Sequence, residues 1–447
     1  MSMIDSLLLS NQFEWGCATS SFQIEGAAAA DGKVPSIWDD FCKQPGRIKD
    51  ASDGLVACDH VRLYREDVAL MADLGFKHYR FSVAWPRVMD ANNKVNHAGM
   101  DFYKRLLDEL ARYNITPNAT LFHWDLPSHL AGGWLNRDTA YRFADYAQHV
   151  AQELGDRLPR VATLNEPWCS AFLGHDLGVF APGGRNRAES LSAAHHLMLA
   201  HGLGVQAWRS VKPDTSVGIV LNPELCDAAT DREQDVSAAR MAELERNDCF
   251  LNPLFGREWP QELINQIGAR AADRREGDVA ICAQPLDFIG LNYYTRSIAR
   301  APVSAEEVSR GYAFVPPNPA LPLTDIGWEI YPEGLTRVVN NLTAHWPLPA
   351  IWITENGAAD NTGLRHGQCD DDMRCSYLTS HLEQVAELVR NGVDVRGYYV
   401  WSLLDNFEWA HGYSQRFGIV HVDFDTQVRT PKKSARFLQA HLRALTD

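Results

Sequence analysis

The sequence predicts a single (β/α)₈ (TIM) barrel, an α/β fold in which eight parallel strands form a closed ring inside a ring of helices. Short runs of β-branched and aromatic residues alternate with longer amphipathic segments, which is the pattern of a parallel sheet with crossover helices. There are eight such runs, one for each strand of the barrel. Because these barrels run from roughly 200 to over 400 residues as one unit, we expect residues 1–447 to form one domain.

The expected barrel strands follow one another along the whole chain. They span residues 14–20, 78–85, 115–124, 160–166, 216–222, 287–294, 350–355 and 395–401. The amphipathic segments between them predict helices over residues 61–74, 99–113, 137–154, 191–211, 334–342 and 375–391. No low-complexity linker divides the chain, and the Gly/Asp-rich segment 46–59 and the Pro-rich segment 316–322 are predicted to be long loops at the substrate entrance.

Composition and charge narrow the class of partner. Hydrophobic residues make up 45% of the chain and charged residues 22%, which is ordinary for a soluble protein with a large core. The formal charge of −15, from 42 Lys and Arg against 57 Asp and Glu, disfavours nucleic acid and anionic membrane surfaces as partners. No apolar stretch approaches the ~20 residues of a membrane helix. The sequence therefore predicts a neutral small-molecule substrate. The oligomeric state does not follow from it.

The first residues and the cysteines indicate the compartment. The segment MSMIDSLLLSNQ has no basic start, carries Asp5 and has an apolar run of only Leu7 to Leu9, so no secretory signal is expected. The nine cysteines are an odd number and none are spaced as Cys-x-x-Cys, which favours free thiols over a disulfide framework. We therefore expect a cytoplasmic protein.

Two short glutamate motifs stand at the ends of predicted strands far apart in the chain. TLNEP contains Glu166, and ITENG contains Glu355. In each motif an asparagine, Asn165 or Asn356, stands beside the acid, and an amide can bind a polyhydroxylated ligand without adding charge. Because the carboxyl ends of parallel barrel strands meet at one face, we expect the two carboxylates to face one site.

Two glutamates at one site suit the cleavage of an acetal. That reaction needs an acid to protonate the departing oxygen and a carboxylate to meet the positive charge that develops at the anomeric carbon. Arg80, at the end of the second strand, and Tyr294, after the sixth, are candidates to keep Glu355 ionised. Glu166 has Trp168 nearby and no evident cation, so burial is expected to keep it protonated in the resting enzyme.

Polar and aromatic side chains at the expected strand ends suit the binding of a sugar. Polar groups bind hydroxyls, and an aromatic face covers the C–H side of a sugar ring. The candidates are Gln23, His123, Trp124, Asn165, Asn292, Tyr294, Trp401, Glu408 and Trp409. Trp168 and Trp328 are candidates to hold the leaving group, and Leu173, Val179 and Phe180 to narrow the same entrance.

No metal or nucleotide site is indicated. His195, His196 and His201 fall on one expected helix but lack the i, i+4 spacing of a zinc pair, and there is no HExxH motif. Neither GxGxxG nor GxxxxGK followed by Ser or Thr occurs. Since two carboxylates can cleave an acetal by themselves, we expect no cofactor and no metal.

Taken together, these motifs resemble those of the family 1 glycoside hydrolases, the β-glucosidase family. TLNEP and ITENG match the two glutamate motifs of the family, and SSFQIEG, LFHWDLP and WSLLDNFEW are close to further family patterns. The resemblance covers nearly the whole chain, from Glu14 to about Leu442. It implies a retaining double displacement with Glu166 as acid/base and Glu355 as nucleophile, whose carboxyl groups lie ~5 to 5.5 Å apart.

The resemblance also implies how the sugar is held. In the family, the position of Trp401 provides the stacking floor, and that of Glu408, expected to be ionised, binds the 4- and 6-hydroxyls. The other matched positions also hold the non-reducing sugar, and an aromatic residue is common at the position of Trp328. The segment HDLGVFAPGG departs from the more usual family versions at His175 and Phe180. The leaving-group preference therefore stays open.

The sequence favours a retaining β-glucosidase that hydrolyses terminal non-reducing β-D-glucosyl residues of small β-glycosides and cello-oligosaccharides. β-Galactosyl and β-fucosyl residues are further candidate substrates. One alternative is a 6-phospho-β-glycosidase, a subgroup that usually replaces the Glu408 and Trp409 pair with residues that accept a phosphate. The other is a catalytically silent sugar-binding barrel, in which one of the two glutamates is typically lost. This chain has both Glu408 and Trp409, and it also has both glutamates, Glu166 and Glu355.

Overall fold

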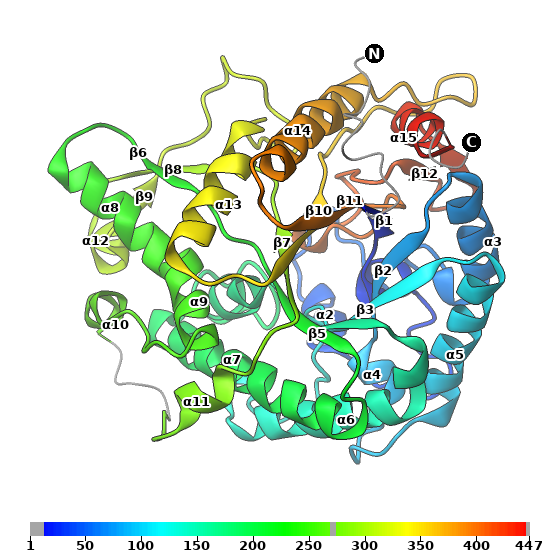
Figure 1. The fold of residues 1–447 in the computed structure, drawn as a ribbon, viewed down its shortest axis with the longest axis horizontal. Helices are drawn as coiled ribbons and strands as arrows, with labels where there is room; N and C mark the ends of the chain where they lie inside the picture. Colours follow the sequence, from blue (N-terminus) through cyan, green and yellow to red (C-terminus); the bar gives the residue numbers. More distant parts are fainter. Residues whose placement is uncertain (1–12, 269–273, 444–447) are drawn as a thin grey trace.

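Eight parallel strands close into the expected barrel. The computed structural model describes residues 13–268 and 274–443 (Figure 1). Around the ring, each strand pairs with the next one along the chain, and the last pairs with the first. The barrel strands are β1 Glu14–Ala18, β2 His78–Ser82, β3 Thr116–Phe122, β4 Arg160–Asn165, β5 Ser216–Leu221, β7 Phe288–Asn292, β10 Ala350–Asn356 and β11 Val395–Trp401. The (β/α)₈ prediction is therefore confirmed, and β10 extends one residue beyond its expected run.

Helices cover the outside of the barrel, because parallel strands need crossover connections (Figure 1). The six expected helices are α3 His60–Asp73, α5 His97–Arg112, α6 Asp138–Leu154, α7 Arg187–Val211, α13 Glu333–His345 and α14 Asp372–Arg390. A further helix that the sequence pattern does not predict, α15 Lys433–Arg443, follows β11. Within residues 13–268 and 274–443, no helix is long and apolar enough to cross a membrane.

The segments around β7 contain elements that the sequence pattern does not predict. Before β7 lie β6 Cys226–Ala228, α8 Glu233–Glu243, the π-helix η4 Leu244–Asp248, α9 Cys249–Leu254, α10 Gln261–Ile267 and α11 Asp278–Cys282. After β7 lie β8 Ser297–Arg300, α12 Ala305–Arg310 and β9 Ala313–Phe314. Strands β6, β8 and β9 form a small sheet outside the barrel, on the left of Figure 1. Apart from the 11-residue α8, these elements are shorter than the window in which a period can be recognised.

Other short elements belong to the remaining connections. They are α1 Ser21–Ile24, α2 Ile37–Cys42, α4 Trp85–Val88, η1 Gly133–Leu135, η2 Gly155–Arg157, the π-helix η3 Cys169–Leu173, η5 Trp409–His411, and the ribbon of β12 Val420–Val422 with β13 Arg429–Pro431. The expected loop 46–59 lies between α2 and α3, and the expected loop 316–322 lies between β9 and α13.

Irregularities in the barrel sheet fall next to the two glutamate motifs. The pairing of β4 with β5 shifts register between Ala162 and Asn165. The pairing of β10 with β7 shifts between Ile353 and Glu355, after which Glu355 stands opposite Asn292. Such irregularities bend a strand locally and redirect its side chains. They therefore help to set the direction in which the side chains at these two strand ends point.

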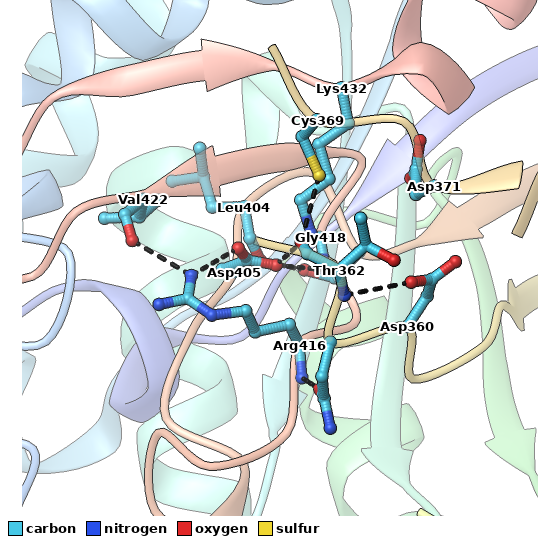
Figure 2. A network of polar contacts seen from close by, with 12 residues as sticks. Asp360, Thr362, Cys369, Asp371, Leu404, Asp405, Arg416, Gly418, Val422 and Lys432 are labelled. Carbon is cyan, nitrogen blue, oxygen red and sulfur yellow. Dashed lines mark hydrogen bonds and ion pairs between the residues drawn. The ribbon is translucent and has the colours of Figure 1, made fainter. Parts of the chain in front are cut away.

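A buried charge network holds the loop that follows β11 (Figure 2). Asp405 in this loop accepts one hydrogen bond from Nζ of Lys432 (2.7 Å) and one from Nη1 of Arg416 (2.7 Å). The backbone N–H of Gly418 donates a third (3.0 Å). Asp405 and Lys432 are fully buried. Because the same loop carries Glu408, this network helps to fix the position of a candidate sugar-binding residue.

Replacing Lys432 with methionine should destabilise the protein, because Asp405 would lose a charged partner while staying buried. Breaking a buried pair costs about 3 to 5 kcal/mol, and the lower end applies because Arg416 remains. The matched control is Lys433→Met. This neighbour pairs with Asp372 at 2.6 Å, where the two side chains are 36% and 69% exposed, and an exposed pair contributes about 0 to 1 kcal/mol. Denaturant unfolding measures both variants, and equal losses would contradict the role of the network.

Candidate active site

A cavity of about 460 Å³ opens where β4, β7, β10 and β11 end. Its wall brings together most of the residues selected from the sequence. These are His123, Trp124, Glu166, Trp168, Asn292, Tyr294, Trp328, Glu355, Trp401, Glu408 and Trp409. Residues far apart in the chain meet here because a parallel barrel places the carboxyl ends of all its strands on one face.

Glu355, the last residue but one of β10, is buried and bound by two donors. Arg80 of β2 forms an ion pair with it, with Nη1 2.5 Å from Oε1. The hydroxyl of Tyr294 donates a hydrogen bond to Oε2 (2.6 Å). Both contacts favour the ionised carboxylate. The structure thus places both expected partners on Glu355.

Glu166, which follows β4, is bound by neutral donors. Asn292 donates from Nδ2 to Oε1 (2.6 Å), and the thiol of Cys169 donates to Oε2 (3.1 Å). The hydroxyl of Thr354 donates to Oδ1 of Asn292 (2.7 Å), which fixes the end of the amide that faces Glu166. Glu166 has a φ of 45°, in the left-handed region. Non-glycine residues rarely adopt this conformation, and such strain clusters at functional sites.

Burial and mutual repulsion change the acidity of both glutamates. Burial, and then the charge of Glu355, raise the pKa of Glu166 to about 7, against the smaller effect of its neutral donors. Burial also raises the pKa of Glu355, but the charge of Arg80 and the hydroxyl of Tyr294 act in the opposite direction. Two like charges in one buried site repel each other strongly. The single charge of the pair therefore lies on Glu355, beside the cation.

Asn165 and Arg80 lie behind the cavity wall and join several strand ends. Nη2 of Arg80 donates to Oδ1 of Asn165 (2.7 Å), and Nδ2 of Asn292 donates to the same oxygen (3.0 Å). The amide nitrogen of Asn165 lies 3.3 Å from Nε2 of His123. Asn165 was expected to contact the sugar, but in this structure its side chain is not part of the wall.

Gln23 is also not among the residues that line the cavity, and its expected contact with the sugar stays a prediction. The hydroxyl of Ser20 donates to its Oε1 (2.6 Å). Its Nε2 donates to Oδ1 of Asn406 and to the carbonyl oxygen of Phe407 (2.9 Å each). The amide therefore holds the loop after β11. The motif SSFQIEG gives no sign of this role, because Asn406 is 383 residues away in the sequence.

Aromatic rings form one wall of the cavity. The ring of His123 stacks on Trp401 (centroids 5.8 Å apart, planes at 11°) and on Trp409 (6.0 Å, 12°). Trp124 packs against Trp409 with centroids 4.4 Å apart. Burial, and then the charge of Arg80, hold the pKa of His123 well below its usual range, so its ring is neutral. Such a wall can cover the apolar face of a sugar.

Glu408 differs from the expected ionised carboxylate. Its Oε2 is buried and has no hydrogen-bond partner in the part of the chain that the structure describes. Burial, and then the charges of Glu355 and Glu166, raise its pKa to about 8. The carboxyl is therefore largely protonated at neutral pH. The sequence alone does not show this, since the effect depends on how close the three acids lie in space.

Both tryptophans expected at the leaving-group side line the cavity. The guanidinium carbon of Arg246 lies 4.0 Å from the ring centroid of Trp168. Trp328 meets the ring of Tyr294 edge to face, with centroids 5.5 Å apart. These contacts hold the two indoles in place on the wall.

The residues expected to narrow the entrance divide into two groups. Leu173 and Phe180 line the cavity. Val179 is 47% exposed and is not part of the wall, so its place at the entrance stays a prediction. It follows Gly178, whose left-handed φ of 63° turns the chain at this point.

The sequence analysis misses several wall residues. They are Cys169, Asn222, Glu224, Arg246, Arg296, Glu329 and Phe417. Arg246 pairs with Glu224, and Arg296 pairs with Glu329 (3.0 Å). No motif marks these charged pairs, because scattered charges are also typical of an ordinary surface. Cys169 could have been found, since a position three residues after an acid lies within one helical turn of it.

Within the described ranges, no group of three or more His, Cys, Asp or Glu side chains is placed to hold a metal ion. The histidines of α7 have partners inside the protein. His195 contacts Asp278 (2.9 Å) and His201 contacts Thr163 (2.6 Å). These contacts assign the two histidines to the packing of α7.

Comparison with protein families identifies the chain. The model of Glycosyl hydrolase family 1 matches residues 6–444. The chain belongs to glycosyl hydrolase family 1. A β-glucosidase from Agrobacterium sp. (strain ATCC 21400) is 46% identical over 435 residues, which cover 96% of this chain and 94% of the relative. A bifunctional β-D-glucosidase/β-D-fucosidase from Bifidobacterium breve is 40% identical, and the match covers 98% of this chain and 99% of the relative.

Solved structures agree with this assignment. A β-glucosidase from Thermotoga maritima in complex with glucoimidazole matches with a TM-score of 0.92 at 39% identity, over 97% of this chain and 98% of that one. As a family 1 member, the protein is a glycoside hydrolase, and the family is a retaining one. These relatives favour a β-glucosidase over the two alternatives, a 6-phospho-β-glycosidase and a silent barrel.

Replacing Tyr294 with phenylalanine should move the acid limb of the pH profile to higher pH. If Glu355 acts as the nucleophile, as the sequence predicts, activity needs its ionised form and is lost as the pH falls through its pKa. Without the hydroxyl, the carboxylate loses a donor, and its pKa should rise by about one unit. The profile of kcat/KM for an aryl β-glucoside measures this shift.

The control for this variant is Tyr293→Phe. The hydroxyl of Tyr293 donates to the carbonyl oxygen of Tyr331 (2.6 Å) and not to Glu355. Its loss should leave the acid limb in place. An unshifted limb in Tyr294→Phe, or the same shift in both variants, would show that the hydroxyl does not stabilise the charge of Glu355.

Proposed function

We propose that this protein is a retaining β-glucosidase in which Glu355 is the nucleophile and Glu166 the acid/base. The observation that carries the proposal is the unequal environment of two buried carboxyls. Arg80 forms its ion pair with Glu355, whereas neutral donors bind Glu166. One charged and one protonated carboxyl at the same cavity are what the first step of a double displacement requires.

In the first step, an oxygen of Glu355 forms a bond to the anomeric carbon while the bond from that carbon to the leaving oxygen breaks. Glu166 gives its proton to the leaving oxygen, which departs as a neutral alcohol. The product is a glycosyl ester of Glu355. Before the reaction, Arg80 and Tyr294 hold the attacking carboxylate charged and in a fixed orientation.

The second step uses the same two residues in exchanged roles. Esterification removes the charge of Glu355, which helped to raise the pKa of Glu166, so that pKa falls. Glu166 is now a carboxylate and takes a proton from water. The water oxygen bonds to the anomeric carbon and displaces Glu355. Two inversions at one carbon retain its configuration.

We infer that the aromatic wall and Glu408 bind the non-reducing sugar. Trp401 and His123 offer a flat apolar surface, and a protonated Glu408 can donate one hydrogen bond and accept another. This combination supports β-D-glucosyl groups of small glycosides and cello-oligosaccharides as substrates. The bifunctional Bifidobacterium breve relative supports β-fucosyl groups as a second class.

We further infer that the chain acts as one barrel domain in the cytoplasm. All nine cysteines are free thiols, which supports a reducing compartment. The eight barrel strands extend from Glu14 to Trp401, which supports a single folding unit.

Replacing Glu166 with alanine should affect substrates according to their leaving group. A poor leaving group needs protonation, so its kcat/KM should fall by about 10²- to 10⁴-fold. A dinitrophenyl glucoside departs without help from an acid and should lose far less. The variant Glu166→Gln, which keeps the shape of the side chain, serves as the control for packing. If kcat/KM falls equally for both substrates, Glu166 is not the acid.

The unphosphorylated sugar should be preferred over its 6-phosphate by orders of magnitude. A phosphate dianion beside Glu408 would bring negative charge into a cavity that already holds the charge of Glu355. Raising the pH through about 8 ionises Glu408. This should increase the ratio of kcat/KM for the unphosphorylated sugar to that for its 6-phosphate. Values of kcat/KM for an aryl β-glucoside and its 6-phosphate measure the preference.

Replacing Glu408 with serine should lower that ratio mainly by weakening the neutral substrate, with a lower kcat and a higher KM. Glu408→Gln keeps two hydrogen-bonding groups without a titratable proton and is the matched control. It should lose less activity and abolish the increase of the ratio at high pH. A wild-type preference for the 6-phosphate would instead support the phospho-β-glycosidase alternative.

A further inference from the structure

Cys169 contacts the candidate acid/base through both its backbone and its side chain. It is the first residue of the π-helix η3, and its N–H donates to the carbonyl oxygen of Glu166 (3.0 Å). Its thiol lies 3.1 Å from Oε2 of the same residue. Cys169 is 5% exposed and lines the cavity. The tight turn therefore presents the sulfur directly to one carboxyl oxygen of Glu166.

The other carboxyl oxygen is already committed as an acceptor. Thr354 donates to Oδ1 of Asn292, so Nδ2 of Asn292 must face Glu166, where it donates to Oε1. An oxygen that accepts this hydrogen bond in the plane of the amide is poorly placed to carry the acidic proton. The proton of the acid form therefore lies on Oε2. This is the oxygen beside the sulfur of Cys169.

A third side chain donates to the thiol from the other direction along the contact chain. Nδ2 of Asn222, just after β5, donates to Sγ of Cys169 (3.6 Å). The sulfur accepts from Asn222, and its S–H donates to Oε2 of Glu166. The contacts form a chain from Asn222 through Cys169 to Glu166.

We propose that Cys169 is a positioning residue for the acid/base, whose thiol donates to Oε2 of Glu166 and stabilises its ionised form. The proposal rests on the function proposed for Glu166 above. The thiol favours the carboxylate, because a charged carboxylate oxygen accepts its hydrogen bond more strongly than the hydroxyl oxygen of the protonated acid does. Cys169 thus opposes the effect of burial on the pKa of Glu166. It makes it easier for Glu166 to become the base of the second step.

The chemistry of the thiol suits this role. Burial, and then the charge of Glu166, raise the pKa of Cys169 well above its usual range. The sulfur therefore keeps its hydrogen throughout the reaction and acts as a donor. It neither attacks the sugar nor competes with Glu355.

The test compares the pH profiles of kcat/KM for an aryl β-glucoside in wild type, Cys169→Ala and Cys169→Ser. Glycosylation needs a protonated Glu166, so activity falls as the pH rises through its pKa. In Cys169→Ala this alkaline limb should move up by about half a pH unit, the size expected for one neutral hydrogen bond. Cys169→Ser keeps a donor and should stay close to wild type. The acid limb, set by Glu355, should not move.

A second profile tests the same effect in the second step. For a dinitrophenyl glucoside, breakdown of the glycosyl ester limits kcat and needs an ionised Glu166. The acid limb of kcat should therefore also move up in Cys169→Ala. A purely structural disturbance would lower activity at every pH without moving either limb.

Two further variants separate the loss of the Cys169 donor from a loss of packing. Cys169→Val fills the same space without a donor and should shift the limbs as alanine does, so it replaces Cys169→Ala if that variant does not fold. Cys282→Ala removes a buried thiol from α11, outside the cavity wall, and should shift nothing. If wild type gives a bell-shaped profile and the limbs of Cys169→Ala and Cys169→Val coincide with it, the inference is wrong. If wild type does not cleave aryl β-glucosides, the proposed function itself is wrong.

Discussion

The ion pair between Arg80 and Glu355 fixes where negative charge lies in the cavity. Both side chains are buried, and the guanidinium lies 2.5 Å from the carboxylate. A buried carboxyl without such a partner tends to keep its proton, as the raised pKa of Glu408 illustrates. Arg80 thus gives the charge to Glu355 and leaves the proton to Glu166. In the proposed mechanism, the division of roles between nucleophile and acid follows from the position of this one cation.

The barrel supplies the geometry that this pair needs. Arg80 comes from β2 and Glu355 from β10, and Asn165 at the end of β4 binds the same guanidinium. A buried ion pair needs further hydrogen bonds to offset the hydration that its charges lose. Tyr294 donates such a bond to the carboxylate of Glu355, and Asn165 accepts one from the guanidinium of Arg80. Neutral side chains around a buried ion pair can therefore shape the chemistry without adding a second charge.

Much of the fold and part of the site follow from the sequence pattern. A parallel barrel brings all strand ends to one face, so Glu166 and Glu355 could be placed together without any knowledge of distances. The helices α8 to α12 could not be predicted in this way, since short helices gain most of their stability from packing. The partners of Gln23 and the protonation of Glu408 also depend on contacts between distant segments, which no local motif encodes.

The most direct test of the account is to identify the residue that becomes covalently attached to the sugar. An activated 2-deoxy-2-fluoro-β-glucoside slows both steps, and a good leaving group lets the glycosyl ester accumulate. Proteolysis and mass spectrometry then locate the label. The account predicts one fluoroglucosyl group per chain, on the peptide that carries Glu355. A label on the peptide of Glu166, or time-dependent inactivation without any covalent label, would contradict it.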